Sequence, residues 1–139
     1  MLEIRDLRVR FRNRDREAVA GVSLSIREGE IVGLVGESGS GKTVTAMSVA
    51  GLLPRRQCEY SGEILLDGTE LLHAPREALR KVQGKDIGVV FQEPMSSLDP
   101  LMRIGPQVEE VLLVHTKLGR EERRRLALEA LAAVELPEP

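Results

Sequence analysis

The fold of this 139-residue chain is decided by one stretch, Gly36-Glu37-Ser38-Gly39-Ser40-Gly41-Lys42-Thr43. It matches the phosphate-loop pattern G-x-x-x-x-G-K-[ST] at every fixed position. Glycines let successive backbone N–H groups turn inward toward phosphate oxygens. Lys42 brings a positive charge to the outer phosphates, and the Thr43 hydroxyl can bind a Mg²⁺ ion that bridges them. The stretch therefore predicts a site for the phosphates of a nucleotide.

The residues on both sides of this loop support the same interpretation. The apolar run Ile31–Val35 precedes it and predicts a strand buried on both faces, as parallel strands are. Behind it, apolar residues recur at helical spacing, and Pro54 ends the predicted helix. The alternative is a flexible Gly/Ser loop whose lysine has no function. Such a loop would not require a strand before it and a helix after it, so we regard this alternative as the weaker one.

The rest of the chain contains two kinds of strand and several short helices. Two half-exposed strands are predicted near residues 7–11, with an extension to Leu2 broken near Asp6, and near residues 22–26. Residues 62–66 predict a third, closed by the turn dipeptide Asp67-Gly68. Residues 87–91 form a second continuous apolar run and predict another buried strand. Helices are predicted over residues 75–82, from Pro106 and from Arg120.

Composition and charge argue against several classes of protein, such as nucleic-acid-binding, disulfide-stabilised and membrane-spanning proteins. Hydrophobic residues make up 42% and charged residues 30% of the chain, and the formal net charge is −2. The basic residues after Gly119 alternate with Glu121 and Glu122, which is typical of a solvated helix face, so no nucleic-acid partner is expected. Cys58 is the only cysteine, which excludes an internal disulfide. No apolar run approaches the ~20 residues of a membrane span, and the first residues do not resemble a signal peptide.

The segment from Val89 to Pro100, VVFQEPMSSLDP, resembles the Q-loop of ATP-binding-cassette (ABC) ATPase subunits. More narrowly, it is similar to the subunits that drive peptide and nickel importers, including glutathione and microcin importers. Asp99 stands where that subfamily usually has Asn. The phosphate loop, the segment Ser61–Ile64 and the pair Ile104-Gly105 fit the same subfamily in the same order.

The resemblance implies a role for individual residues. Gly36 to Thr43, with Val44, would wrap the triphosphate of ATP. Thr43 and Gln92 would contact Mg²⁺, and Gln92 would also position the attacking water and couple the site to a membrane subunit. Phe11 falls where the family places an aromatic ring that stacks on adenine. The alternatives of a core-filling ring for Phe11 and an ordinary polar strand end for Gln92 stay open.

The resemblance also implies the architecture and the partners. We expect an α/β fold: an ABC-type P-loop NTPase core with an antiparallel β portion over residues 1–91, and the start of a helical subdomain over residues 92–139. The expected function is to couple ATP binding and hydrolysis to uptake of peptide-like solutes. Expected partners are a second ATPase subunit, transmembrane permease subunits and, indirectly, a solute-binding protein, at the cytoplasmic face of the membrane. The alternatives are a soluble ABC protein without a transporter and another P-loop nucleotide-binding protein.

Several parts of an ABC ATPase have no counterpart in this sequence. The signature segment, the Walker B carboxylates, the catalytic Glu that follows them and the switch His are not found. The chain is therefore expected to be an N-terminal portion that binds ATP weakly and does not hydrolyse it, because phosphoryl transfer needs those groups for positioning and charge stabilisation. An unpaired apolar strand at residues 31–35 would also make the chain prone to aggregate.

Overall fold

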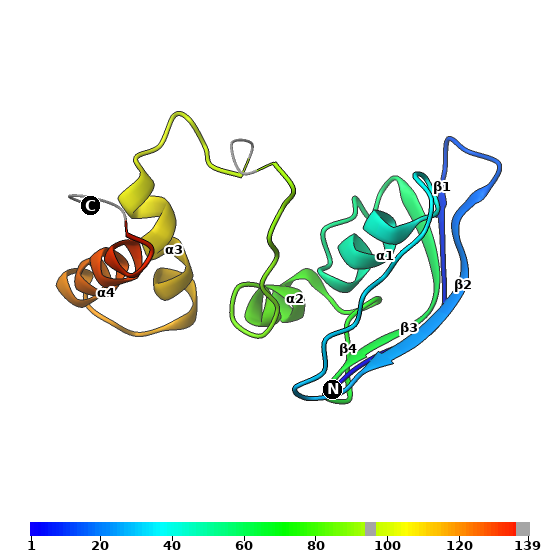
Figure 1. The fold of residues 1–139 in the computed structure, drawn as a ribbon, viewed down its shortest axis with the longest axis horizontal. Coiled ribbons are helices and arrows are strands. Elements are labelled where there is room, and N and C mark those ends of the chain that lie inside the picture. Colours follow the sequence, from blue (N-terminus) through cyan, green and yellow to red (C-terminus); the bar gives the residue numbers. More distant parts are fainter. Residues whose placement is uncertain (94–96, 136–139) are drawn as a thin grey trace. The chain divides into compact units, whose positions relative to one another are not determined.

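The computed structural model describes residues 1–93 and 97–135, which fall into two compact units. The first unit is Met1–Gln83 and contains a sheet and two helices. The second unit is Gly84–Pro139 and contains two helices. Figure 1 shows both as ribbons, and each is described by itself below.

An antiparallel sheet organises the first unit. Its strands are β1 (Leu2–Phe11), β2 (Glu17–Ile26), β3 (Cys58–Leu66) and β4 (Thr69–Glu70), in the spatial order β2-β1-β3-β4. On the central strand β1, Leu7 and Val9 are fully buried, whereas Arg10 is exposed. This alternation confirms the prediction of half-exposed N-terminal strands, because one face of an antiparallel sheet covers the core and the other meets water.

A bulge bends β1 where the sequence predicts a break. Asp6 has φ 44°, and the pairing of β1 with both neighbouring strands shifts register next to it. On β3, Gly62 (φ 93°) lies so close that a Cβ atom there would be 2.4 Å from the Asp6 carbonyl oxygen. Only glycine fits such an approach, so the bulge and Gly62 together set the bend of the sheet.

The predicted turn at Asp67-Gly68 is confirmed as the hairpin between β3 and β4. Both residues have positive φ, 48° and 79°, as a two-residue type I′ turn requires. The two residues that follow β4, Leu71 and Leu72, are buried. The helix α2 (Arg76–Val82) follows and buries Leu79. It begins one residue after Pro75, close to the predicted helix over residues 75–82.

The helix α1 (Lys42–Val49) starts at the end of the phosphate loop and lies along one face of the sheet (Figure 1). Its buried residues Thr45 and Ser48 direct their hydroxyls to backbone carbonyls one turn earlier, those of Gly41 and Val44. The helix is shorter than predicted, because Gly51 (φ 67°) leaves the helical region before Pro54 is reached.

Ion pairs cover the solvent-facing side of the sheet. Three arginines of β1 each reach a glutamate on a neighbouring strand, as Arg8 pairs with Glu17, Arg10 with Glu59 and Arg5 with Glu63. The hydrogen bond and the charge of Arg10 lower the pKa of Glu59. All these side chains are about half exposed, so solvent screens each pair and its contribution to stability is small. Arg5 and Glu63, and likewise Arg10 and Glu59, lie directly opposite each other on β1 and β3, so these two pairs favour the observed register of the strands.

The prediction of buried parallel strands at residues 31–35 and 87–91 is wrong for this structure. Neither run is part of the sheet, and Ile31 is 98% exposed while Val90 is 100% exposed. A parallel strand needs neighbouring strands for its backbone hydrogen bonds and its two apolar faces. Among the described residues no strand runs beside either segment. The apolar pattern alone therefore does not make either run a strand in the described part of the chain.

The second unit consists of α3 (Ile104–His115) and α4 (Arg120–Ala133), which pack against each other. Pro106 lies in the first turn of α3, where its missing N–H is not needed. Gly119 separates the helices and precedes the first residue of α4. Ala127 is buried between them, so both predicted helices are confirmed with starts within two residues of prediction.

The exposed apolar runs should make the 139-residue chain self-associate. We expect Ile31→Lys, and separately Val90→Lys, to lower the apparent mass in static light scattering without changing the far-UV circular dichroism. Each removes a solvent-exposed apolar side chain and adds a charge to a segment that could pair with another chain. Gln57→Lys, which adds the same charge at an exposed polar position, should leave the apparent mass unchanged. A wild-type chain that stays monomeric at high concentration would contradict this expectation.

Candidate nucleotide site

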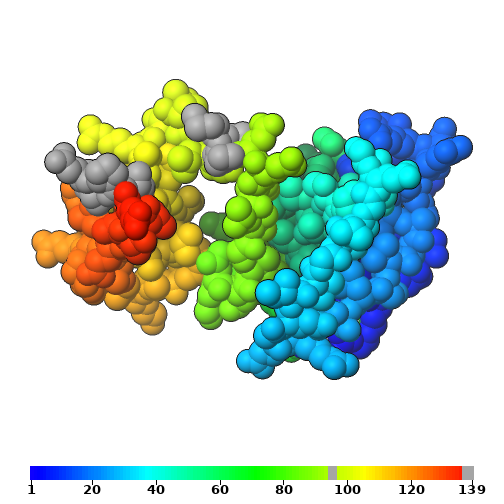
Figure 2. Space-filling view, in the orientation of Figure 1, coloured from blue at the N-terminus to red at the C-terminus, as the bar shows by residue number. Residues whose placement is uncertain are grey.

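The phosphate loop lies on the surface of the first unit, directly before α1. Figure 2 shows the cyan segment that contains it exposed to solvent. Gly41, the residue before α1, has φ 93°, and a Cβ atom there would be 2.4 Å from the carbonyl oxygen of Ala18 on β2. The loop backbone therefore rests directly on the first residues of β2, and only glycine permits this contact.

Lys42 closes the loop on itself. Its Nζ atom donates hydrogen bonds to the carbonyl oxygens of Gly36 at 2.8 Å and Glu37 at 2.7 Å, and to Ser40 Oγ at 3.4 Å. These three acceptors match the three N–H donors of an ammonium group. No carboxylate of the described residues forms an ion pair with Lys42, so its charge is not neutralised within the site.

A cavity of about 290 Å³ opens beside the loop. One wall comes from the end of β1, the turn after it and the start of β2; the other comes from the loop and the first turn of α1. The lining residues are Phe11, Arg14, Arg16, Glu17, Ala18, Gly39, Gly41, Lys42, Thr43 and Val44. Its volume is at the lower end of the range for small-molecule sites, about 300–1,000 Å³. It can therefore hold much of a nucleotide.

Phe11 and Thr43 present their functional groups at this cavity. Phe11 ends β1, is half-buried and does not belong to the core, so a flat ligand ring can reach it. Thr43 is exposed in the first turn of α1, so its hydroxyl is accessible to a metal ion or a phosphate. The N-terminal end of α1 adds a partial positive charge that favours an anion.

The structure brings most of the predicted site residues together. Phe11, Gly39, Gly41, Lys42, Thr43 and Val44 all line the one cavity. Gly36, Glu37, Ser38 and Ser40 belong to the loop behind it, where the first two accept hydrogen bonds from Lys42. Gln92 belongs to the second unit and is exposed. Pro94, Met95 and Ser96 of the predicted Q-loop lie outside the described residues.

Asp99 shows why the departure from Asn in the Q-loop segment is tolerated. Its carboxylate accepts a hydrogen bond from the backbone N–H of Leu101 at 2.8 Å, which forms a turn over Pro100. The side chain of Gln107 fixes this turn from α3 by accepting from the Asp99 N–H and donating to the Asp99 carbonyl. An Asn side chain offers the same acceptor oxygen, so either residue can form this turn.

The sequence alone did not identify Arg14, Arg16, Glu17 and Ala18 as site residues. The stretch after Phe11 matches no motif and shows only that charged residues are frequent. Arginine recurs at residues 12, 14 and 16, but this repeat does not place the side chains, because residues 12–16 form a turn and a bend rather than a strand. The structure shows that Arg14 and Arg16 line the cavity and that Arg12 does not.

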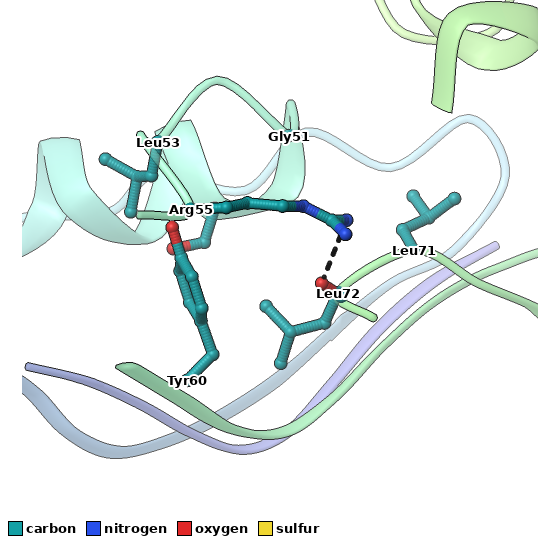
Figure 3. A pocket seen from close by; sticks show the side chains of 7 residues that line it. Gly51, Leu53, Arg55, Tyr60, Leu71 and Leu72 are labelled. Carbon is teal, nitrogen blue, oxygen red and sulfur yellow. Dashed lines mark hydrogen bonds between the residues drawn. The ribbon is translucent and has the colours of Figure 1, made fainter. Parts of the chain in front are cut away.

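A second cavity of the same unit does not compete as a nucleotide site. It lies beside the end of α1 and measures about 10 Å³, room for roughly one water molecule. Figure 3 shows Arg55 reaching across it to the carbonyl oxygen of Leu72, which accepts its hydrogen bond at 3.3 Å. Burial, and then a hydrogen bond with Cys58, raises the pKa of Tyr60 on its edge, so this phenol stays protonated at neutral pH.

Metal binding by protein side chains alone is not indicated. The described residues contain no group of three or more His, Cys, Asp or Glu side chains that could hold a metal ion. A Mg²⁺ ion in proteins commonly keeps waters and binds one or two protein ligands together with substrate phosphates. The hydroxyl of Thr43 beside the phosphate loop fits that kind of site. Within the same described part of the chain, no helix has the length and apolar character needed to cross a membrane.

Comparison with known proteins supports the geometry. The family model described as "ABC transporter" matches residues 19–138. The chain is 39% identical to the oligopeptide transport ATP-binding protein OppD of Bacillus subtilis over 142 residues, which is all of this chain and 40% of OppD. It is 43% identical to the probable D,D-dipeptide transport ATP-binding protein DdpD of Escherichia coli, covering 99% of this chain and 43% of DdpD.

Solved structures give the same result for the fold. The ATP-binding cassette MJ0796, in a dimeric structure with ADP and phosphate bound, superposes with a TM-score of 0.82 at 30% sequence identity. The superposition covers 99% of this chain and 59% of that one. The chain thus spans well under two thirds of the length of the relatives it matches. The match of the family model over residues 19–138 shows that this chain belongs to the ABC transporter family.

Proposed function

We propose that the protein is an ATP-binding subunit of an importer for peptide-like solutes. One observation carries the nucleotide part of this proposal: a single cavity is lined by an aromatic ring, Phe11, and by the phosphate loop with Lys42 and Thr43. A nucleotide has a flat base at one end and a chain of phosphates at the other, and the cavity offers a complementary surface to each. The importer part rests on the names of the relatives, which are peptide-transport proteins.

The residues of the loop would share the work of holding the phosphates. Backbone N–H groups of the loop and the N-terminal end of α1 would bind the phosphate oxygens. Lys42, already held near the centre of the loop by Gly36 and Glu37, needs little movement to meet the outer phosphates. Phe11 would stack on the adenine ring, and this stacking would orient the base relative to the phosphates.

The metal expected with ATP would be Mg²⁺, held by the Thr43 hydroxyl, with Gln92 as a second protein ligand. Such an ion would supply positive charge that offsets the negative charge on the phosphates during phosphoryl transfer. Lys42 and Thr43 are the first two residues of α1, so the same turn of backbone fixes the lysine and the residue that would hold the metal. Gln92 belongs to the second unit. In this proposal it would be a ligand of the metal and would couple the nucleotide site to a membrane subunit.

The remaining parts of the proposal concern the whole protein. Its partners would be a second ATP-binding subunit and transmembrane permease subunits, with a solute-binding protein acting indirectly, at the cytoplasmic face of the membrane. The dimeric state of the MJ0796 cassette supports pairing of two such subunits. Residues 1–91 would form part of the ATP-binding core, and residues 92–139 the Q-loop and the start of a helical subdomain.

We expect the 139-residue chain to bind ATP without hydrolysing it. Binding should be weak and should be lost on Lys42→Ala, because the ammonium is the one side-chain charge of the loop placed for the outer phosphates. No phosphate release above background is expected from either protein, since the sequence supplies no catalytic carboxylate of the ABC type. Isothermal titration calorimetry and a phosphate-release assay measure the two properties. A turnover that disappears in Lys42→Ala would show that the site is catalytically complete.

The contact between the loop and β2 gives a second expectation. Gly41→Ala should weaken ATP binding by about tenfold or more, because the new Cβ would push the loop away from the Ala18 carbonyl and would strain a residue at φ 93°. Gly39→Ala is the matched control: Gly39 has φ 80°, but a Cβ there meets no atom within 4 Å. The difference in ATP affinity between the two variants, measured by calorimetry, isolates the contact from backbone strain. Equal losses would mean that the contact with β2 does not hold the loop.

A further inference from the structure

The turn between β1 and β2 separates its charges by sign. Asp15 and Glu17 line a hollow on the sheet side together with Arg8 and Arg10. The Glu17 carboxylate lies 3.2 Å from Arg8. The hydrogen bond and charge of Glu59 raise the pKa of Arg10, and the charges of Glu17 and Asp15 add to this effect. The acidic residues of the turn are therefore directed toward the arginines of the sheet, where opposite charges satisfy them.

The basic residues of the same turn face the other way. Arg14 and Arg16 line the cavity beside the phosphate loop. They alternate in sequence with Asp15 and Glu17. Neither forms an ion pair with a carboxylate of the described residues, and Glu17, the one acid that also lines this cavity, is held by Arg8. The cavity thus contains unneutralised cations on both walls.

Two backbone features hold these arginines in place. Arg14 is turned back over β1 because its N–H donates to the carbonyl of Phe11 at 2.9 Å. Its guanidinium carbon lies 5.9 Å from the centre of the Phe11 ring, within reach of a cation–π interaction. Arg16 precedes Ala18 by two residues, and the carbonyl of Ala18 is the group against which Gly41 packs. Arg14 is therefore held over the ring, and Arg16 lies close in sequence to the point where β2 meets the loop.

We propose that Arg14 and Arg16 form a second anion-binding wall of the nucleotide site and recognise the phosphate nearest the ribose. This inference rests on the proposed function, because it takes the base to lie at Phe11 and the outer phosphates at Lys42. The α-phosphate of a nucleotide in that orientation lies between these two ends, and Arg14 and Arg16 line the same cavity as Phe11 and Lys42. Guanidinium groups suit the task, since their planar set of N–H donors matches phosphate oxygens.

A set of charge-matched variants tests the proposal on the full chain. Arg14→Gln with Arg16→Gln removes the wall. Arg12→Gln with Arg56→Gln removes the same two charges from exposed positions that do not line the cavity. AMP, ADP and ATP are titrated into each protein by calorimetry, with far-UV circular dichroism confirming that the fold is kept. Lys42→Ala is titrated in parallel as a measure of the outer-phosphate site.

The wall variant should bind all three nucleotides about three- to tenfold more weakly than the control pair, as expected for two partly solvated charge contacts. The loss of affinity should be similar for each nucleotide, because all three carry the α-phosphate. The double variant Arg14→Lys with Arg16→Lys should recover part of the lost affinity. Lys42→Ala should instead weaken ATP far more than AMP. Equal affinities of the wall variant and the control pair, or a loss confined to ATP, would overturn the inference. If Lys42→Ala leaves ATP binding unchanged, the proposed nucleotide site itself fails, which is a separate result.

Discussion

The contact between Gly41 and the Ala18 carbonyl is the constraint on which the candidate site depends. A Cβ at Gly41 would lie 2.4 Å from that oxygen, so the backbone of the loop and the backbone of β2 touch with no side chain between them. This approach fixes the phosphate loop relative to the antiparallel sheet, and with it the distance between Lys42 and the end of β1. The cavity exists because two segments from different parts of the chain are held together at this point.

Side chains on the central strand of the sheet alternate between two faces, and the two faces have different roles. Along β1, Leu7 and Val9 enter the core, while Arg8 and Arg10 pair with glutamates of β2 and β3. The turn after Phe11 interrupts this alternation, and beyond it Asp15 lines the hollow of the sheet arginines while Arg14 and Arg16 line the cavity at the loop. The strand period thus produces the core, and the turn adds an excess of positive charge to the cavity.

Local signals in the sequence were sufficient where the structure depends on local geometry. The loop pattern, the break near Asp6 and the Asp67-Gly68 turn were all predicted, because each is a short segment whose residue types restrict the backbone. The runs at residues 31–35 and 87–91 were mispredicted, because a buried parallel strand is defined by neighbours that no local pattern reveals. Arg14 and Arg16 were missed for a related reason: their place beside the loop appears only when the turn after Phe11 and the loop, distant in sequence, line one cavity.

Lys42 is held by acceptors that the backbone of its own loop provides. An ammonium group inside a ring of backbone atoms would be costly without acceptors, and the carbonyls of Gly36 and Glu37 provide them. These contacts hold the loop closed around the charge, so little conformational freedom remains to be lost when phosphates bind. The carbonyls also reduce the field of the lysine at the cavity. A second source of positive charge on the opposite wall would offset that reduction, and Arg14 and Arg16 stand at the place where it is needed.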